Sequence, residues 1–145
     1  MQKKVTVQYL TDYNYSQLVT TEGHSFVVDE PASDGGNGLG PSPYEMLLGA
    51  LGSCTAMTLL MYARRKGWDL TECSVHLTHN RVHAEDSANA EQGTRRIDVI
   101  TRDISLHGHI DEEQKARLLE IAEKCPVHKT LMAEPRVIDS IIVGE

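Results

Sequence analysis

Alternation of apolar and polar residues marks several short strands in the first third of the chain. Val5, Val7 and Tyr9 alternate with polar neighbours. The segments at residues 15–21 and 24–30 have the composition of strands and are separated by a turn that contains a glycine. We therefore expect three strands before residue 31, with a turn between the second and the third.

A long apolar helix is predicted after a loop rich in glycine and proline. Ser42 and Glu45 form an S-x-x-E capping box with Pro43 at the first helical position, and Lys66 precedes a terminating Gly67. Apolar residues occupy most of the helix circumference: Met46, Leu47, Leu48, Ala50, Leu51, Met57, Leu60 and Met61. A helix that is apolar all round is buried, so in a chain of 145 residues we expect a sheet or a second subunit to cover it.

Two alternating segments, residues 73–82 and 95–110, predict a two-stranded ribbon joined by a polar hairpin loop. The apolar phase of the second segment slips between Val99 and Ile100, which predicts a bulge there.

The last third of the chain predicts a second helix and a final strand. The helix is expected over residues 111–125, capped at Asp111, with Pro126 starting a short further turn. Residues 136–145 read as a closing strand. Because strands and helices are segregated along the chain, we expect the α+β class, in one domain over residues 1–145.

Charge and composition exclude several functions. The net charge is −7, from 14 basic and 21 acidic residues, which argues against binding of nucleic acid or of an anionic membrane surface. The first residues lack the apolar core of a signal peptide, and no window reads as long enough to span a bilayer. We therefore expect a cytoplasmic protein with no membrane segment.

Histidine is the first candidate for site chemistry. His107 and His109 lie on the same side of one predicted strand and make a two-ligand set. Nothing supplies a third and fourth ligand at the spacing of a zinc site, so solvent-facing histidines are the favoured interpretation. We expect neither a metal nor a cofactor.

The three cysteines leave two interpretations open. Cys54 lies inside the long apolar helix, Cys125 at the end of the second helix, and Cys73 at the start of a strand. Taken singly, each is more often a structural residue than a reactive one. Taken together, Cys54 and Cys125 are the material for a reversible disulfide, provided that the fold brings them within bonding distance.

Two motifs carry a resemblance to a known family. The segment GPSPYEMLLGALGSCTAMTL around Cys54, followed much later by EKCPVHKTL around Cys125, is similar to the OsmC/Ohr family, the osmotically inducible proteins and organic hydroperoxide resistance proteins. The order of elements matches along nearly the whole chain. The resemblance implies an intertwined homodimer whose two long central helices are wrapped by antiparallel sheets.

The resemblance also implies thiol-dependent peroxidase chemistry. Cys54 matches the cysteine that attacks the peroxide, and Cys125 matches the resolving cysteine that condenses with the sulfenic acid. Cys73 matches no motif, so we expect it to be a bystander. The implied partners are a small-molecule peroxide, organic rather than hydrogen peroxide, and a dithiol reductant. The alternative is an OsmC-like stress or ligand-binding protein whose cysteines sense redox state or are vestigial.

The chain departs from the family pattern at the group that stabilises the thiolate. Family peroxidases use an arginine from the N-terminal sheet or the loop after it, held by a glutamate of the long helix, yet residues 5–42 contain no arginine. Tyr44 aligns with that glutamate and Glu45 falls one place later, where it also serves as the capping acid. Tyr44 and Glu45 are therefore candidate site residues beside the two cysteines. The missing positive charge is expected from Lys129, His128 or an arginine of the second subunit.

Overall fold

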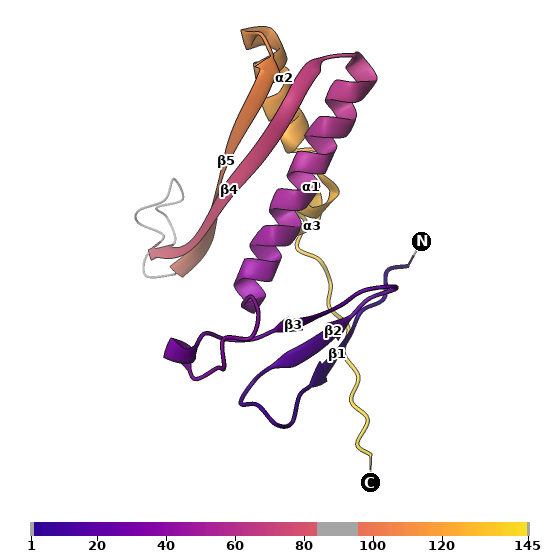
Figure 1. Ribbon diagram of the computed structural model, residues 1–145, viewed down its shortest axis with the longest axis vertical. Helices are drawn as coiled ribbons and strands as arrows, with labels where there is room; N and C mark the ends of the chain where they lie inside the picture. The colour runs from indigo at the N-terminus through magenta and orange to yellow at the C-terminus, as the bar shows by residue number, and fades with distance from the viewer. Residues whose placement is uncertain (1, 84–95, 145) are drawn as a thin grey trace. The chain divides into compact units, whose positions relative to one another are not determined.

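The computed structural model describes residues 2–83 and 96–144 of the chain (Figure 1). Its contacts group into two compact units, residues 1–49 and residues 50–145, with the boundary inside the first α-helix. Antiparallel sheets and helices occupy separate stretches of the chain, which confirms the α+β class. The single domain over residues 1–145 stays a prediction.

The first unit is built on a three-stranded antiparallel sheet with β2 in its centre. Its strands are those that the alternation predicted: β1 (Thr6–Tyr9), β2 (Gln17–Thr20) and β3 (Ser25–Val28). Val19 of the central strand pairs with Val7 on one side and with Phe26 on the other. This row of apolar cross-strand neighbours fixes the register, because a slip of one residue would turn Val19 to the opposite face.

A buried carboxylate, Asp29, folds the glycine-rich loop that follows β3. Its side chain is only 2% exposed. It accepts four hydrogen bonds of 2.8–3.3 Å, from the Ser16 hydroxyl and from the backbone N–H groups of Glu30, Asn37 and Leu39. Burial raises the pKa of Asp29, but these hydrogen bonds outweigh it and hold the pKa below its ordinary value. The carboxylate thus satisfies backbone donors that the loop would otherwise leave without partners.

Helix α1 (Pro43–Lys66) begins and ends where its sequence signals predict. The Ser42 N–H donates to the Glu45 carboxylate at 2.7 Å, and the Glu45 N–H donates to the Ser42 hydroxyl at 3.3 Å, which completes the capping box. Gly67 has a φ of +69°, a conformation in which a side chain would be strained, and it terminates the helix.

Helix α1 is covered by the rest of its own chain over only part of its apolar surface. The buried residues of the helix are Leu51, Gly52, Thr55, Leu59, Tyr62 and Ala63. Met57 and Met61, on another side, are 57% and 67% exposed. One chain alone therefore does not bury the whole circumference of α1, although its apolar residues predict a fully buried helix.

The prediction that no window is long enough to span a bilayer is wrong for α1. The helix meets the length and composition of a membrane span. Its charges gather in the first turn, at Glu45, and in the last turn, at residues 64–66, so the stretch between them is uninterrupted. Core helices of soluble proteins have the same length and composition, and α1 buries one side against its own chain.

The ribbon consists of β4 (Asp69–His83) and β5 (Arg96–His109), paired antiparallel as predicted. The predicted hairpin loop lies mostly outside the described residues. The bulge is not where the sequence placed it, because Val99 and Ile100 pair in unbroken register. The register shifts instead between Leu70 and Glu72, opposite Gly108.

Glycine is required at this irregularity. Gly108 has a φ of +129°, and a Cβ built on it would lie 1.9 Å from the Asp69 carbonyl oxygen. The apparent slip at Val99 has a different cause. Val99 and Ile100 point to opposite faces of the ribbon and both are partly buried, so both faces are apolar at this level.

The core of the second unit lies between α1, the ribbon and α2, which Figure 1 shows running beside one another. The cluster of buried side chains comprises Leu59, Tyr62, Leu118, Ile121 and Ala122. Ribbon side chains, among them Cys73, Ile104 and Leu106, pack against it. The approach of α1 to the ribbon is close, because a Cβ on Gly52 would lie 2.6 Å from Leu77.

Two helices end the regular structure. Helix α2 (Glu112–Ala122) starts at the predicted cap, where the Asp111 carboxylate accepts from the Gln114 N–H at 2.7 Å. It ends three residues earlier than predicted, and Cys125 instead precedes α3 (Pro126–Met132) as its N-terminal cap residue. Pro126 occupies the first helical position, as expected.

The predicted closing strand over residues 136–145 is absent. Residues 134–144 form no regular element. Their apolar side chains are 81–94% exposed: Val137, Ile138, Ile141, Ile142 and Val143. A strand exists only when another strand satisfies its backbone, and none in the described part of this chain pairs with the segment.

Candidate active site

The fold brings Cys54 and Cys125 together within the second unit. Cys54 lies in the middle of α1, Cys125 lies between α2 and α3, and their thiols are close enough for each to shift the pKa of the other. Both are free thiols. Cys125 is fully buried, whereas Cys54 is partly exposed. The two cysteines of the quoted motifs are therefore neighbours, and we refer to this pair as the dithiol site.

The start of α3 supplies backbone donors to this site. Pro126 has no N–H, so the first free donors of the helix are those of Val127 and His128. These backbone N–H groups lower the pKa of Cys125, and that of Val127 also acts to lower the pKa of Cys54. Two residues of α3 were expected from the sequence to supply positive charge. His128 acts on Cys125 through its backbone N–H, and the Lys129 side chain is exposed.

The two thiols differ in acidity. Burial raises the pKa of the Cys54 thiol, and the hydrogen bond and negative charge of Cys125 raise it further. Burial also raises the pKa of Cys125, but hydrogen bonds from Cys54, from the backbone of His128 and Val127 and from Thr55 outweigh it. The pKa of Cys125 is therefore lowered while that of Cys54 is raised, so the two thiols titrate as a coupled pair.

Sequence analysis missed two polar residues beside the pair, Arg102 and Thr55. Nη1 of Arg102, on β5, donates to the Thr55 hydroxyl at 2.9 Å and to the Ala122 carbonyl at 3.4 Å. Thr55 directly follows Cys54 and is fully buried. The position of Arg102 in the sequence could have indicated its role, because it lies on the same face of β5 as Ile104 and Leu106. An arginine in such an apolar row needs a partner on the helix packed against it.

Glu45 and Tyr44, the other candidates, lie in the first turn of α1 and belong to the first compact unit. The Glu45 carboxylate is engaged in the capping box with Ser42. Tyr44 is 48% exposed. Their roles in a site stay predictions.

A largely apolar groove of about 320 Å³ is lined by residues close to the cysteines along the chain, although neither cysteine lines it. Its lining includes Thr58, whose hydroxyl donates to the Cys54 carbonyl at 2.7 Å, and Pro126, which follows Cys125. Met61 and Ile121 supply apolar wall, and Lys124 is the charged residue nearest to Cys125 along the chain. The groove thus combines an apolar wall with two cations, Arg65 and Lys124.

Cys73, the third cysteine, lies apart from this arrangement. It is on β4, paired across the ribbon with Leu106, and packs against the core cluster. Burial alone raises its pKa. It makes the contacts of a small core hydrophobe.

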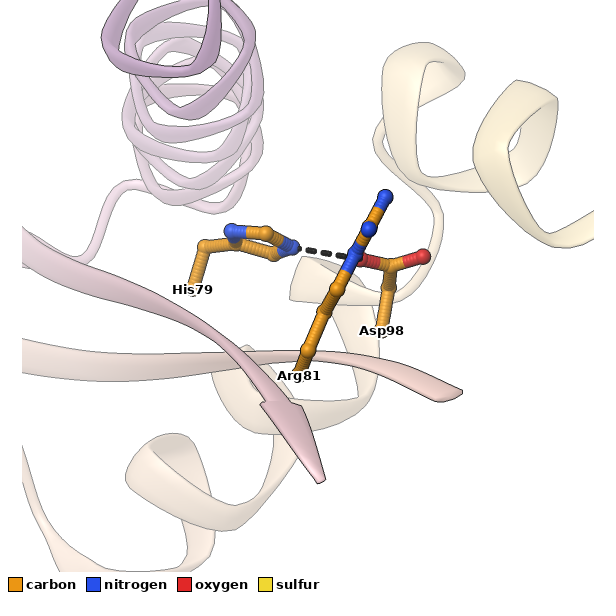
Figure 2. A network of polar contacts seen from close by, with 3 residues as sticks. All are labelled: His79, Arg81 and Asp98. Atoms are coloured by element: carbon orange, nitrogen blue, oxygen red, sulfur yellow. Dashed lines mark hydrogen bonds and ion pairs between the residues drawn. The ribbon is translucent and has the colours of Figure 1, made fainter. Parts of the chain in front are cut away.

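Histidine forms no metal site in the part of the chain that the structure describes. Among residues 2–83 and 96–144, no group of three or more His, Cys, Asp or Glu side chains could hold a metal ion. Figure 2 shows a polar cluster on the ribbon. Oδ1 of Asp98 is hydrogen-bonded to Nε2 of His79 at 2.8 Å and accepts a hydrogen bond from Nε of Arg81 at 3.2 Å. Asp98 and Arg81 are more than half exposed, so this cluster has the character of a surface ion-pair network.

Comparison with known families identifies the fold. The family model for OsmC-like proteins matches residues 35–139, which include both cysteine motifs. The chain belongs to the OsmC-like protein family. A search of the curated proteins finds no match for this OsmC-like chain.

Solved structures similar to this OsmC-like chain agree with that assignment. The OsmC-like protein of Mycoplasma pneumoniae has a TM-score of 0.72 at 18% identity, covering 92% of this chain and 89% of that one. An organic hydroperoxide resistance protein OsmC of Legionella pneumophila has a TM-score of 0.65 at 15% identity, covering 92% and 90%. The organic hydroperoxide resistance protein OhrB of Bacillus subtilis has a TM-score of 0.61 at 16% identity, covering 92% and 93%. At these identities the likeness shows the OsmC/Ohr fold.

Proposed function

We propose that this OsmC-like protein reduces organic hydroperoxides through the Cys54–Cys125 pair. The proximity of the two thiols, close enough for each to shift the pKa of the other, carries the proposal. Two thiols from separate elements, one buried and one reachable, are the arrangement that a peroxide-driven dithiol–disulfide cycle requires. Membership of the OsmC-like family, which includes neighbours named for organic hydroperoxide resistance, supports the same chemistry.

Accessibility assigns the roles. Cys54 is the partly exposed thiol, so the peroxide meets it first, and its proton passes to the neighbouring Cys125 thiolate. The Cys54 thiolate attacks the distal peroxide oxygen, the O–O bond breaks, and the alkoxide leaves and takes a proton from water. Cys54 is then a sulfenic acid. The Cys125 thiol displaces its oxygen as water and forms the disulfide, which a dithiol reductant returns to two thiols.

The groove beside Cys54 favours an apolar substrate. Met61, Ile121 and Pro126 line it, so an alkyl or aryl hydroperoxide buries carbon there. Hydrogen peroxide has no apolar surface and gains nothing from these walls. The proposed substrates are therefore organic hydroperoxides, reduced in the cytoplasm by a small or protein dithiol.

We propose further that the protein works as a homodimer. The exposed methionines of α1 and the exposed apolar side chains of residues 137–143 form more uncovered apolar surface than a monomer usually carries. A second copy that covers α1 and pairs with residues 136–144 accounts for both. Analytical ultracentrifugation at low micromolar concentration should give twice the mass of one chain. A species with the mass of a single chain would overturn the dimer.

The test of the function uses the reduced protein with cumene hydroperoxide. We expect peroxide loss sustained by dithiothreitol, together with the loss of two of the three free thiols when no reductant is present. Peptide mass mapping should then find a Cys54–Cys125 link. A dominant link through Cys73, or three persistent thiols, would reject the dithiol cycle.

The raised pKa of Cys54 favours a second candidate, an OsmC-like stress or ligand-binding protein that uses the pair to sense redox state. A protonated thiol reacts slowly with peroxide, which suits a sensor better than an enzyme. The two candidates differ in turnover. A sensor oxidises once and stops, whereas a peroxidase consumes many equivalents of peroxide for each dithiol site.

A further inference from the structure

Arg102 connects the two segments that carry the cysteines. Its Nη1 donates both to the Thr55 hydroxyl, on the residue next to Cys54, and to the Ala122 carbonyl at the end of α2. The Ala122 carbonyl also accepts from the Cys125 N–H at 3.4 Å. A single nitrogen of β5 is therefore bonded to the Cys54 helix and to the turn that positions Cys125.

The charge of Arg102 strengthens this connection. Among the described residues, no carboxylate forms an ion pair with Arg102, so nothing draws the guanidinium away from Thr55 and Ala122. Hydrogen bonds from a charged donor are roughly twice as strong as those between neutral groups. Because the side chain is partly buried, water replaces these bonds poorly when they break.

The contact with Arg102 also fixes how Thr55 uses its hydroxyl. A guanidinium only donates, so the Thr55 oxygen must accept from it, and the single hydroxyl hydrogen is directed elsewhere. That hydrogen is donated to the Leu51 carbonyl at 2.7 Å. Arg102 and Leu51 together therefore fix the orientation of the Thr55 hydroxyl, on the residue next to Cys54.

We propose that Arg102 is a positioning residue of the dithiol site, which holds the Cys54 and Cys125 segments together through Thr55 and the Ala122 carbonyl. The proposal rests on the proposed function in that it gives the pair a redox role. Its direct consequence is a high effective concentration of one thiol near the other. That quantity is measured by the disulfide equilibrium and needs no peroxide.

The experiment equilibrates the protein with defined ratios of reduced and oxidised dithiothreitol and quantifies the Cys54–Cys125 disulfide. Arg102→Met should lower the equilibrium constant for disulfide formation about tenfold, which is about 30 mV for a two-electron couple. Arg102→Lys keeps the charge but loses the planar fork, so we expect partial rescue, to a loss of about threefold. Arg96→Met, an exposed arginine on the same strand, is the matched control and should leave the constant unchanged.

The outcomes separate this inference from the function. The positioning role is overturned if the equilibrium constant for disulfide formation in Arg102→Met stays within twofold of the parent value. It is also overturned if that constant rises, because a rise is the result expected when only the electrostatic effect of the arginine is lost. An equal drop in Arg96→Met also overturns it. If Arg102→Met does not fold, Arg102→Lys decides in the same way. If the parent protein turns over peroxide but the Arg102 variants leave the disulfide equilibrium constant unchanged, only the positioning role is rejected. If the variants change the constant but the parent does not turn over peroxide, only the peroxidase function is rejected.

Discussion

Asp29 and Cys125 are both buried polar side chains next to the end of a regular element, yet their hydrogen-bond donors differ in kind. The Asp29 carboxylate accepts hydrogen bonds from the Ser16 hydroxyl and from three backbone N–H groups, none of which titrates. The pKa of Cys125 is lowered by backbone N–H groups and also by the neighbouring thiol of Cys54, which does titrate. Burial with fixed donors holds a loop in place, whereas burial with one exchangeable donor leaves a proton free to move.

The largest effect should come from removing that exchangeable donor. Cys54→Ser replaces the attacking thiolate by a hydroxyl that is not ionised at neutral pH, so peroxide turnover should fall by roughly a hundredfold or more. Cys73→Ser is the matched control and should retain turnover, because Cys73 lies away from the pair. Both are measured as cumene hydroperoxide loss with dithiothreitol. Equal losses in the two variants would contradict the assignment of the site.

Asp29→Asn tests the other half of the comparison. The amide keeps the shape of the carboxylate but removes its charge and one acceptor oxygen, so a loop donor loses its partner. We expect the Tm to fall by roughly 5–10 °C. The exposed Asp34 of the same loop provides the control, because Asp34→Asn should leave the Tm within about 1 °C of the parent. Disulfide formation by Asp29→Asn well below its Tm should match the parent. A parent-like Tm would show that the carboxylate does not support the loop.

A pH series sharpens the role of charge at Asp29. Because the pKa of Asp29 is lowered in the folded state, its ionised form stabilises the protein above the unfolded pKa, and this stabilisation is lost as pH falls through the folded pKa. The gap in urea midpoint between the parent and Asp29→Asn should therefore narrow between pH 7 and pH 3. A gap of constant width would mean that the carboxylate acts through shape and not through charge.

The smallest effect is expected at Glu45. Glutamine also completes a capping box, so Glu45→Gln should keep the peroxide turnover within about twofold of the parent. Glu45→Ala, which removes the cap, should lower stability by about 0.5–1 kcal/mol in urea unfolding. A tenfold drop in turnover for Glu45→Gln, with unchanged stability, would instead make Glu45 a carboxylate of the active site.

The sequence predicted best what local chemistry decides. The caps at Ser42 and Asp111 and the end of α1 at Gly67 depend on a few neighbouring residues, and all three are confirmed. The bulge was misplaced because apolar residues on both faces of β5 imitate a change of phase. The closing strand was wrong because a strand needs a partner that the described part of this chain does not provide.

The site required tertiary information. The motifs named Cys54 and Cys125, but no spacing could show that the two thiols are neighbours, because Cys125 reaches α1 only through the packing of α2. The cations expected from the sequence were Lys129, His128 or an arginine of the second subunit, and Arg102 of the same chain was not among them. An arginine on a strand that alternates polar and apolar residues reads as a solvent-facing residue until the inner face of β5 is known.

The C-terminal segment has a consequence for how the protein must be made. Residues 137–143 combine five exposed apolar side chains with a single charge, at Asp139, and contain no proline. These features characterise segments that assemble into cross-β aggregates when left unpaired. Newly synthesised chains would then divide between productive pairing and aggregation, so dilute and gradual expression should give more soluble protein than rapid accumulation.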